Sequence, residues 1–82
     1  MNIEVRLFAN LARMLPPGSQ NKRAKMTVEN GTTIGGLLNI LKINPGITKI
    51  HMVNMVNGVQ KGVETELYEG DVVSVIPPIA GG

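Results

Sequence analysis

Apolar and charged residues alternate at the beginning of the chain. Residues 3–8 read Ile-Glu-Val-Arg-Leu-Phe, and this period of two predicts a half-buried β-strand. Residues 72–76, Val-Val-Ser-Val-Ile, predict a final strand in which Val73 and Val75 point inward and their neighbours point outward. The same criteria predict three further strands, over residues 24–29, 51–56 and 59–63.

A helical period replaces the alternation in two segments. Apolar residues within 34–41 fall at i, i+3, i+4 and i+7, which predicts the principal helix with one stripe facing a sheet. A threonine at 32–33 is expected as its N-cap, and Asn-Pro-Gly at 44–46 is expected to end it. The two glycines at 35–36 indicate either a close approach of the helix to the sheet or random sequence drift without structural meaning. A shorter helix of about two turns is predicted over residues 9–15.

Turn residues join these elements into one order. Asn57-Gly58 is typical of a tight turn between two strands, and Gly70-Asp71 precedes the final strand, with the Asp71 side chain expected to bond to the turn backbone. The order β-α-β-α-β-β-β with one principal helix predicts the α+β class, a mixed sheet covered on one face. The first and last strands then become central neighbours, as in the ubiquitin-like β-grasp fold.

The last six residues do not continue the sheet. Pro77 and Pro78 have no N–H to donate to a strand ladder, so we expect a domain over residues 1–76 and an extended tail over 77–82. Gly81 and Gly82 have no β-carbon, which lets the tail enter a narrow channel and leaves the terminal carboxylate open to attack. The tail is therefore the candidate reactive group.

Composition limits the alternatives. A chain of 82 residues forms one domain with little room for a deep pocket. Its apolar runs are far shorter than the ~20 residues that span a bilayer, and charges near the N-terminus argue against a signal peptide. We therefore expect a cytoplasmic protein that does not contact membranes. With no cysteine, any sulfur chemistry must use an atom other than a side-chain thiol.

The charged residues favour no nucleic-acid or metal site. The net charge is only +2, and the basic residues at 22–25 are interpreted as a solvated strand edge. With one Tyr, one Phe and no Trp, platforms for base stacking are scarce. His51 is the only histidine, so we predict no metal site. The carboxylates at 64, 66, 69 and 71 are expected to be solvated rather than paired for acid–base catalysis.

Several motifs resemble the MoaD/ThiS family of sulfur carriers, over the whole chain. Residues 69–82 (EGDVVSVIPPIAGG) resemble the family signature dGDeVaviPPvaGG. Residues 56–58 (VNG) match the family turn, and residues 5–13 (VRLFANLAR) match its VrfFA-lre opening. The match is most similar to the MoaD branch, whose members are small subunits of molybdopterin synthase.

The resemblance implies that this chain is a carrier and that its partners catalyse. An E1-like enzyme would use ATP to adenylate Gly82, and a persulfide from a desulfurase or rhodanese would convert it to a thiocarboxylate. The tail, with Pro77, Pro78 and Ala80 before the glycines, would then enter a large molybdopterin synthase subunit or another sulfur-accepting enzyme. No stably bound cofactor is implied.

The family also implies an apolar contact surface for these partners. Phe8 and Ile76 occupy positions where the family places such contacts, although both could instead belong to the core. The third position follows the VNG turn, where Val59 or Gln60 is the candidate. The glycines at 35–36 depart from the larger or acidic residues usual in the family helix, and the loop 44–49 is short.

Three other functions remain open from the sequence. The first is sulfur transfer for thiamine or cysteine synthesis, although thiamine carriers are usually shorter and rarely have Pro-Pro before the tail. The second is a ubiquitin-like protein modifier that forms isopeptide bonds through Gly82. The third is a protein-interaction domain with an incidental tail.

Overall fold

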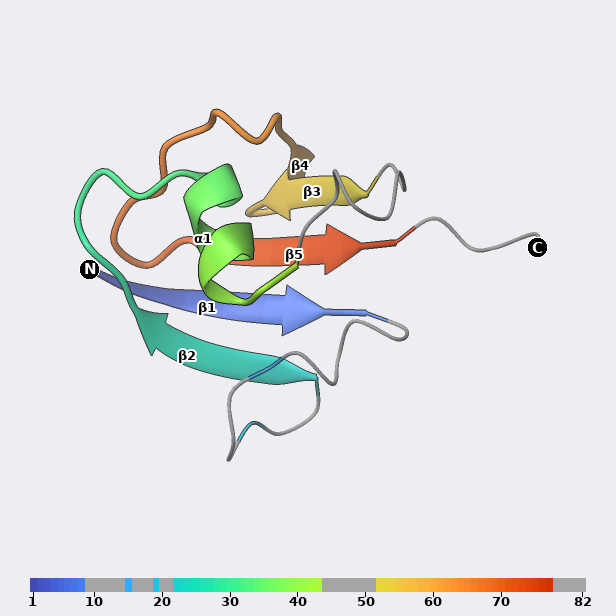
Figure 1. Cartoon of the computed structure of the whole chain (residues 1–82), viewed down its shortest axis with the longest axis horizontal. Helices are drawn as coiled ribbons and strands as arrows, with labels where there is room; N and C mark the ends of the chain where they lie inside the picture. The colour runs from blue at the N-terminus through green and yellow to red at the C-terminus, as the bar shows by residue number, and fades with distance from the viewer. Residues whose placement is uncertain (9–14, 16–18, 20–21, 44–51, 78–82) are drawn as a thin grey trace.

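Within the described part of the chain, a five-stranded mixed sheet carries one helix on one of its faces (Figure 1). The computed structural model describes residues 1–8, 15, 19, 22–43 and 52–77. The sheet order is β2-β1-β5-β3-β4, so the first and last strands lie side by side in its centre. The elements are β1 (Asn2–Leu7), β2 (Arg23–Thr27), α1 (Ile34–Ile40), β3 (Val53–Val56), β4 (Val59–Gln60) and β5 (Val72–Ile76).

The central pair of strands is parallel, and it forms the middle of the core. Val5 pairs with Val73 and Leu7 with Val75, and none of these four side chains is exposed to solvent. The other strand pairs are antiparallel. This is the β-grasp arrangement predicted from the sequence, with the inward residues of β5 as expected. Residues 9–14 of the predicted short helix over 9–15 and most of the tail lie outside the described residues.

Helix α1 packs its apolar stripe on the sheet, and Thr33 is its N-cap residue. The Thr33 hydroxyl accepts a hydrogen bond from the Gly36 N–H at 3.1 Å, which confirms the predicted N-cap. The first helical N–H groups bind carbonyl oxygens of the segment before β5: Ile34 N to Thr65 O at 2.9 Å and Gly35 N to Val63 O at 2.8 Å. These bonds satisfy donors that a helix start otherwise leaves free. The fourth strand was predicted to reach residue 63, but β4 ends at Gln60. The Val63 carbonyl accepts a hydrogen bond from the helix instead of pairing with a strand.

The two helical glycines differ in their surroundings. A Cβ on Gly35 would lie 3.3 Å from the Val63 carbonyl oxygen, whereas one on Gly36 would meet only ordinary contacts at 3.5 Å. We expect Gly36→Ala to raise the free energy of unfolding by about 0.5–1 kcal/mol, through helix propensity. Gly35→Ala is expected to raise the free energy of unfolding by less, because the Val63 carbonyl must move away from the new Cβ. Urea denaturation of both variants checks this order, and a larger gain for Gly35→Ala would contradict it.

The C-terminal end of α1 is a Schellman motif built on a lysine. Lys42 has φ 62°, its N–H donates to Asn39 O at 3.0 Å, and the Ile43 N–H donates to Leu38 O at 2.9 Å. Ile43 and Leu38 are both buried beside this turn. The prediction that residues 44–46 end the helix is therefore wrong: α1 ends at Ile40, before them.

Replacing Lys42 by Gly should stabilise the protein. A non-glycine residue in the left-handed region costs about 1–2 kcal/mol, and the added flexibility of Gly in the unfolded chain offsets part of the relief. We expect a net gain of about 0.5–1 kcal/mol in the free energy of unfolding, measured by urea denaturation. Lys42→Ala is the matched control, because it removes the same side chain but keeps the strain. Equal stability of the two variants would contradict the argument.

The tight turn between β3 and β4 is tied to the start of β5. Asn57 and Gly58 have φ 52° and 85°, the conformation predicted for this pair. The Asn57 Oδ1 accepts from the Val72 N–H at 3.0 Å, and its Nδ2 donates to Asp71 Oδ1 at 3.0 Å. Asp71 Oδ2 accepts from the Tyr68 N–H at 2.8 Å, which confirms its predicted role in the turn. These bonds fix the position of Val72 at the start of β5, and therefore the position of Ile76, where the strand ends.

Candidate functional site

The root of the tail lies at the end of the central strand. β5 ends at Ile76, and Pro77 follows it half-buried. Because β1 runs parallel to β5, Phe8 reaches the same end of the sheet, and its N–H donates to the Val75 carbonyl at 3.2 Å. Figure 1 shows β5 in the middle of the sheet, with its arrowhead at the same end as that of β1. Residues Pro78, Ala80, Gly81 and Gly82 lie outside the described residues.

An apolar patch covers this end of the sheet face opposite α1. Phe8 and Ile76 follow the buried residues Leu7 and Val75, so alternation places both side chains on the face without the helix. Val53 lies directly opposite Ile76, and Met55 is two residues further along β3 on the same face. We define the open-face patch as Phe8, Val53, Met55 and Ile76. Phe8 is 40% exposed and the other three are half-buried, so Phe8 and Ile76 do not belong to the core.

Val59 does not join this patch. It pairs with Val56, whose buried side chain faces α1, so Val59 projects to the helix side of the sheet, where it is 55% exposed. Gln60 pairs with Met55 and shares its open face. Of the three candidate contact residues, the structure therefore brings Phe8 and Ile76 together and leaves Val59 on the other face.

Sequence reasoning missed Val53 and Met55. The run Met52-Val53-Asn54-Met55-Val56 has apolar residues on both faces of the strand, and its one polar side chain, that of Asn54, points into the core and is only 7% exposed. Its Oδ1 has no hydrogen-bond partner among the residues that the structure describes. A polar residue at a buried position concealed the true alternation of β3.

The other half of the open face is charged. Arg6 donates from Nε to a Glu4 carboxylate oxygen, and this bond lowers the pKa of Glu4. The opposing effect of desolvation is outweighed with the help of the positive charges on Arg6, Arg23 and Lys25. Glu4 therefore stays ionised to a lower pH than a free glutamate. Its interaction with these cations stabilises the fold at neutral pH and is lost as the pH falls through the lowered pKa.

The carboxylates considered for catalysis serve the backbone or lie in solvent. Asp71 holds the turn before β5, and Glu69 Oε1 accepts from the Asn2 N–H at 2.8 Å. Glu64 and Glu66 are exposed. Across the described part of the chain, no group of three or more His, Cys, Asp or Glu could hold a metal ion. His51 lies outside that part.

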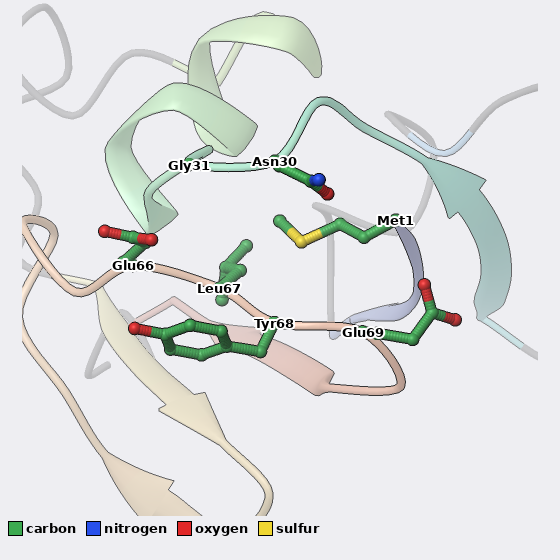
Figure 2. Close-up of a pocket in the computed structure, with 7 residues that line it drawn as sticks. All are labelled: Met1, Asn30, Gly31, Glu66, Leu67, Tyr68 and Glu69. Carbon is green, nitrogen blue, oxygen red and sulfur yellow. The ribbon is translucent and has the colours of Figure 1, made fainter.

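A surface pocket occurs at the opposite end of the molecule from the tail root. Figure 2 shows Leu67 and Tyr68 on one side of it and Met1 and Asn30 on the other, with Glu69 beside them. These residues belong to the start of β1 and to the segments before α1 and β5. Because β1 and β5 are parallel, their starts lie a full strand length from Pro77, and the pocket is separate from the root of the tail. Among the described residues, no helix is long and apolar enough to cross a membrane.

Sequence comparison identifies relatives along the whole chain. The sequence model of the ThiS family matches residues 5–82. Small archaeal modifier protein 3 from Haloferax volcanii is 31% identical to this chain, and the alignment covers 100% of both proteins. Both matches include the C-terminal glycines.

Solved structures show the same fold. SAMP1 from Haloferax volcanii superimposes with a TM-score of 0.73 at 24% identity, covering 100% of each chain. A chain from the complex of subunits 1 and 2 of molybdopterin-converting factor from Helicobacter pylori matches with a TM-score of 0.60 at 24% identity, again covering 100% of each chain. At this identity the likeness shows the ubiquitin-like β-grasp fold and no more.

Proposed function

Because the chain belongs to the ThiS family of small ubiquitin-like carrier and modifier proteins, we propose that it carries sulfur on the carboxyl group of Gly82. The sulfur serves molybdopterin synthesis, for the molybdenum or tungsten cofactor, and partner enzymes catalyse every step. The observation that carries this proposal is the geometry of the tail root. A central strand delivers the tail beside an exposed apolar patch, so a partner that docks on the patch receives the tail at once.

The chemistry requires activation of a poor electrophile. A Gly82 carboxylate oxygen attacks the α-phosphorus of ATP on an E1-like enzyme, and pyrophosphate leaves. The terminal sulfur of a donor persulfide, on a desulfurase or rhodanese, attacks the acyl-adenylate carbon and AMP leaves. A second thiol of the donor system reduces the resulting acyl disulfide, which gives the thiocarboxylate and a donor disulfide. This chain has no cysteine, so every thiol in this series of reactions belongs to a partner protein.

Docking on the open-face patch is the physical requirement for these transfers. Phe8, Val53, Met55 and Ile76 offer apolar area that water covers in the free protein, and its burial favours association at about 25 cal/mol per Å2 before the costs of binding. The proline at 77 restricts the backbone where the tail leaves the sheet, so less conformational entropy is lost when the tail enters a channel. The patch supplies affinity and the tail supplies the reactive group.

A ubiquitin-like modifier is the second candidate. The 31% identity to a protein named small archaeal modifier protein 3 favours it. The same acyl-adenylate, or a thioester derived from it, would be attacked by a lysine amine of a target protein, which forms an isopeptide bond. The two functions share the activation step and differ only in the nucleophile, so one chain can serve both.

The test is intact-mass spectrometry of the protein expressed in a host that thiolates such carriers. We expect a fraction heavier by one sulfur-for-oxygen exchange, and none in the variant that lacks Gly82. If the heavier species persists in that variant, sulfur is bound elsewhere and the proposal is wrong. Conjugates of higher mass that carry a Gly82–lysine linkage would instead establish the modifier function. Co-purification of a large synthase subunit with the wild type would support the molybdopterin branch over thiamine or cysteine synthesis.

A further inference from the structure

Two arginines lie directly opposite each other on the open face of the sheet. Arg6 near the end of β1 pairs in register with Arg23 at the start of β2. Like charges at directly opposed positions of an antiparallel pair destabilise a sheet. Glu4 bonds to Arg6 but faces Lys25 across the strands, so one carboxylate serves three cations. The pair therefore carries a positive charge that the described residues do not neutralise.

This arginine pair adjoins the open-face patch. Arg6 lies opposite Ser74 of β5, and Ser74 lies opposite Met55 of β3. One row across the open face therefore runs from Arg23 through Arg6 and Ser74 to Met55, and Ile76 is next in β5 toward the tail. Arg23 and Lys22 are exposed, and the Arg6 side chain is 38% exposed. The positive charge thus borders the apolar surface beside the tail root.

Most of the acidic residues lie toward the other end of the molecule. They occupy the segment before α1 and the segment between β4 and β5, which meet at the bridge between Thr33 and Glu66. Figure 1 shows the segment before α1 on the side of the N-terminus, and the segment between β4 and β5 running from β4 to that same side, where β5 begins. The acidic residues of these segments are Glu29, Glu64, Glu66, Glu69 and Asp71. The charge separation makes the tail end of the sheet the positive end.

We propose that the protein partner that receives the tail presents carboxylates to Arg6 and Arg23, next to an apolar surface that covers the open-face patch. This inference rests on the proposed function for the identity of the patch as the docking surface. A partner carboxylate between the two arginines would remove their repulsion and form charge-assisted hydrogen bonds. The positive end would also orient the carrier during its approach, with the tail leading.

An acidic protein fits this surface better than a nucleic acid does. Binding of single strands without sequence preference uses several aromatic side chains that stack on bases. The sequence contains one Phe and one Tyr, and Tyr68 lies in the pocket at the far end. The patch beside the arginines consists otherwise of aliphatic and methionine side chains, which suit the apolar centre of a protein interface.

A first experiment uses poly-L-glutamate as the acidic probe and follows amide NMR shifts of the intact protein at low salt. We expect the largest shifts at Arg6, Arg23 and Ser74, and loss of binding at high salt. Arg23→Gln should weaken binding about fivefold, the effect of one exposed charge contact of about 1 kcal/mol. Lys61→Gln is the matched control, because it changes the net charge equally at an exposed residue after β4. Equal weakening by both variants would overturn the inference.

Arg23→Gln should lower the affinity for the acidic probe without lowering the thermal stability of the protein. Arg23→Gln relieves the repulsion with Arg6, so we expect its melting temperature to equal or exceed that of the wild type while its affinity for poly-L-glutamate falls. A loss of both stability and affinity would indicate a structural role and would contradict the inference. Tighter binding of a single-stranded oligonucleotide than of poly-L-glutamate, through the same amides, would also overturn it.

A second experiment measures the thiocarboxylate fraction in the expression host. Arg23→Gln should lower this fraction at limiting activating enzyme, and Lys61→Gln should not. If the wild type is never thiolated but the poly-L-glutamate result holds, the proposed function fails and the acidic-partner surface survives. If the wild type is thiolated and the two variants match it equally, only the acidic-partner inference fails.

Discussion

Replacing Val75 by Asp is expected to unfold the protein. Val75 has no solvent-exposed surface and lies in the central strand, in register with Leu7 on one side and Asn54 on the other. A carboxylate there loses its hydration without gaining a cation, which costs several kcal/mol, and the apolar packing is lost as well. A domain of this size has a total stability of only about 4–12 kcal/mol. We therefore expect loss of the cooperative thermal transition, measured by circular dichroism.

Ser74→Asp is the matched control for that variant. It introduces the same carboxylate one residue earlier, on the open face, where Arg6 lies directly opposite. The charge stays hydrated and gains a cation, so the free energy of unfolding should change by less than about 1 kcal/mol. A cooperative transition in Val75→Asp, or unfolding of both variants, would contradict the assignment of the two faces of β5.

Gly81→Ala is expected to leave the fold intact and to slow sulfur loading sharply. In the proposed mechanism the tail enters a narrow channel of its partner, which a β-carbon would obstruct, and the alanine would also restrict the backbone angles next to Gly82. Misplacement of a reacting group by about 1 Å can cost about a hundredfold in rate, so we expect a loss of at least tenfold in the rate of thiocarboxylate formation. Mass spectrometry over a time course after induction measures this rate.

The control for the tail variant is Gly36→Ala, the same chemical change within α1. Both variants should keep the wild-type far-ultraviolet circular dichroism spectrum. Only Gly81→Ala should accumulate thiocarboxylate slowly. Loading of Gly81→Ala at the wild-type rate would exclude a narrow channel around the tail, although it would leave the role of Gly82 itself untouched.

The elements with the clearest periodicity could be predicted from the sequence. The alternation in β1 and β5 identified the inward residues because both strands pass through the centre of the sheet and are buried on one face only. The Thr33 cap and the Asn57-Gly58 turn are local hydrogen-bond and backbone preferences, so neighbouring residues determine them. The order of the elements, compared with the β-grasp fold, also predicted the first and last strands as central neighbours, and the structure pairs them.

Features that depend on distant contacts could not be predicted in this way. The helix ends at Ile40 and the chain turns at Lys42 because Ile43 finds a buried site, and nothing in the local sequence requires a lysine with positive φ. β4 is short because the Val63 carbonyl binds the start of α1. The faces of β3 were concealed by the buried Asn54. In each case tertiary packing decided between conformations that the local sequence allows.

The candidate site shows the same division. Alternation correctly placed Ile76 and Phe8 on one face, and a two-residue turn at 57–58 would already have set Val59 opposite Val56, on the other face. The length of this turn was therefore enough to exclude Val59 from the face that carries Ile76. The Arg6–Arg23 pair depends on the register of β1 against β2, which a long connection separates, so it required the structure.

The position of β5 also affects when the protein can offer its terminus to an enzyme. A ribosome makes the chain from the N-terminus, so β5, which completes the middle of the sheet, is synthesised after the four other described strands. Until β5 inserts between β1 and β3, Ile76 is not beside Phe8 and the surface that a partner needs is incomplete. If the proposed activating partner recognises that surface, a complete chain in which β5 is not yet in place would escape activation.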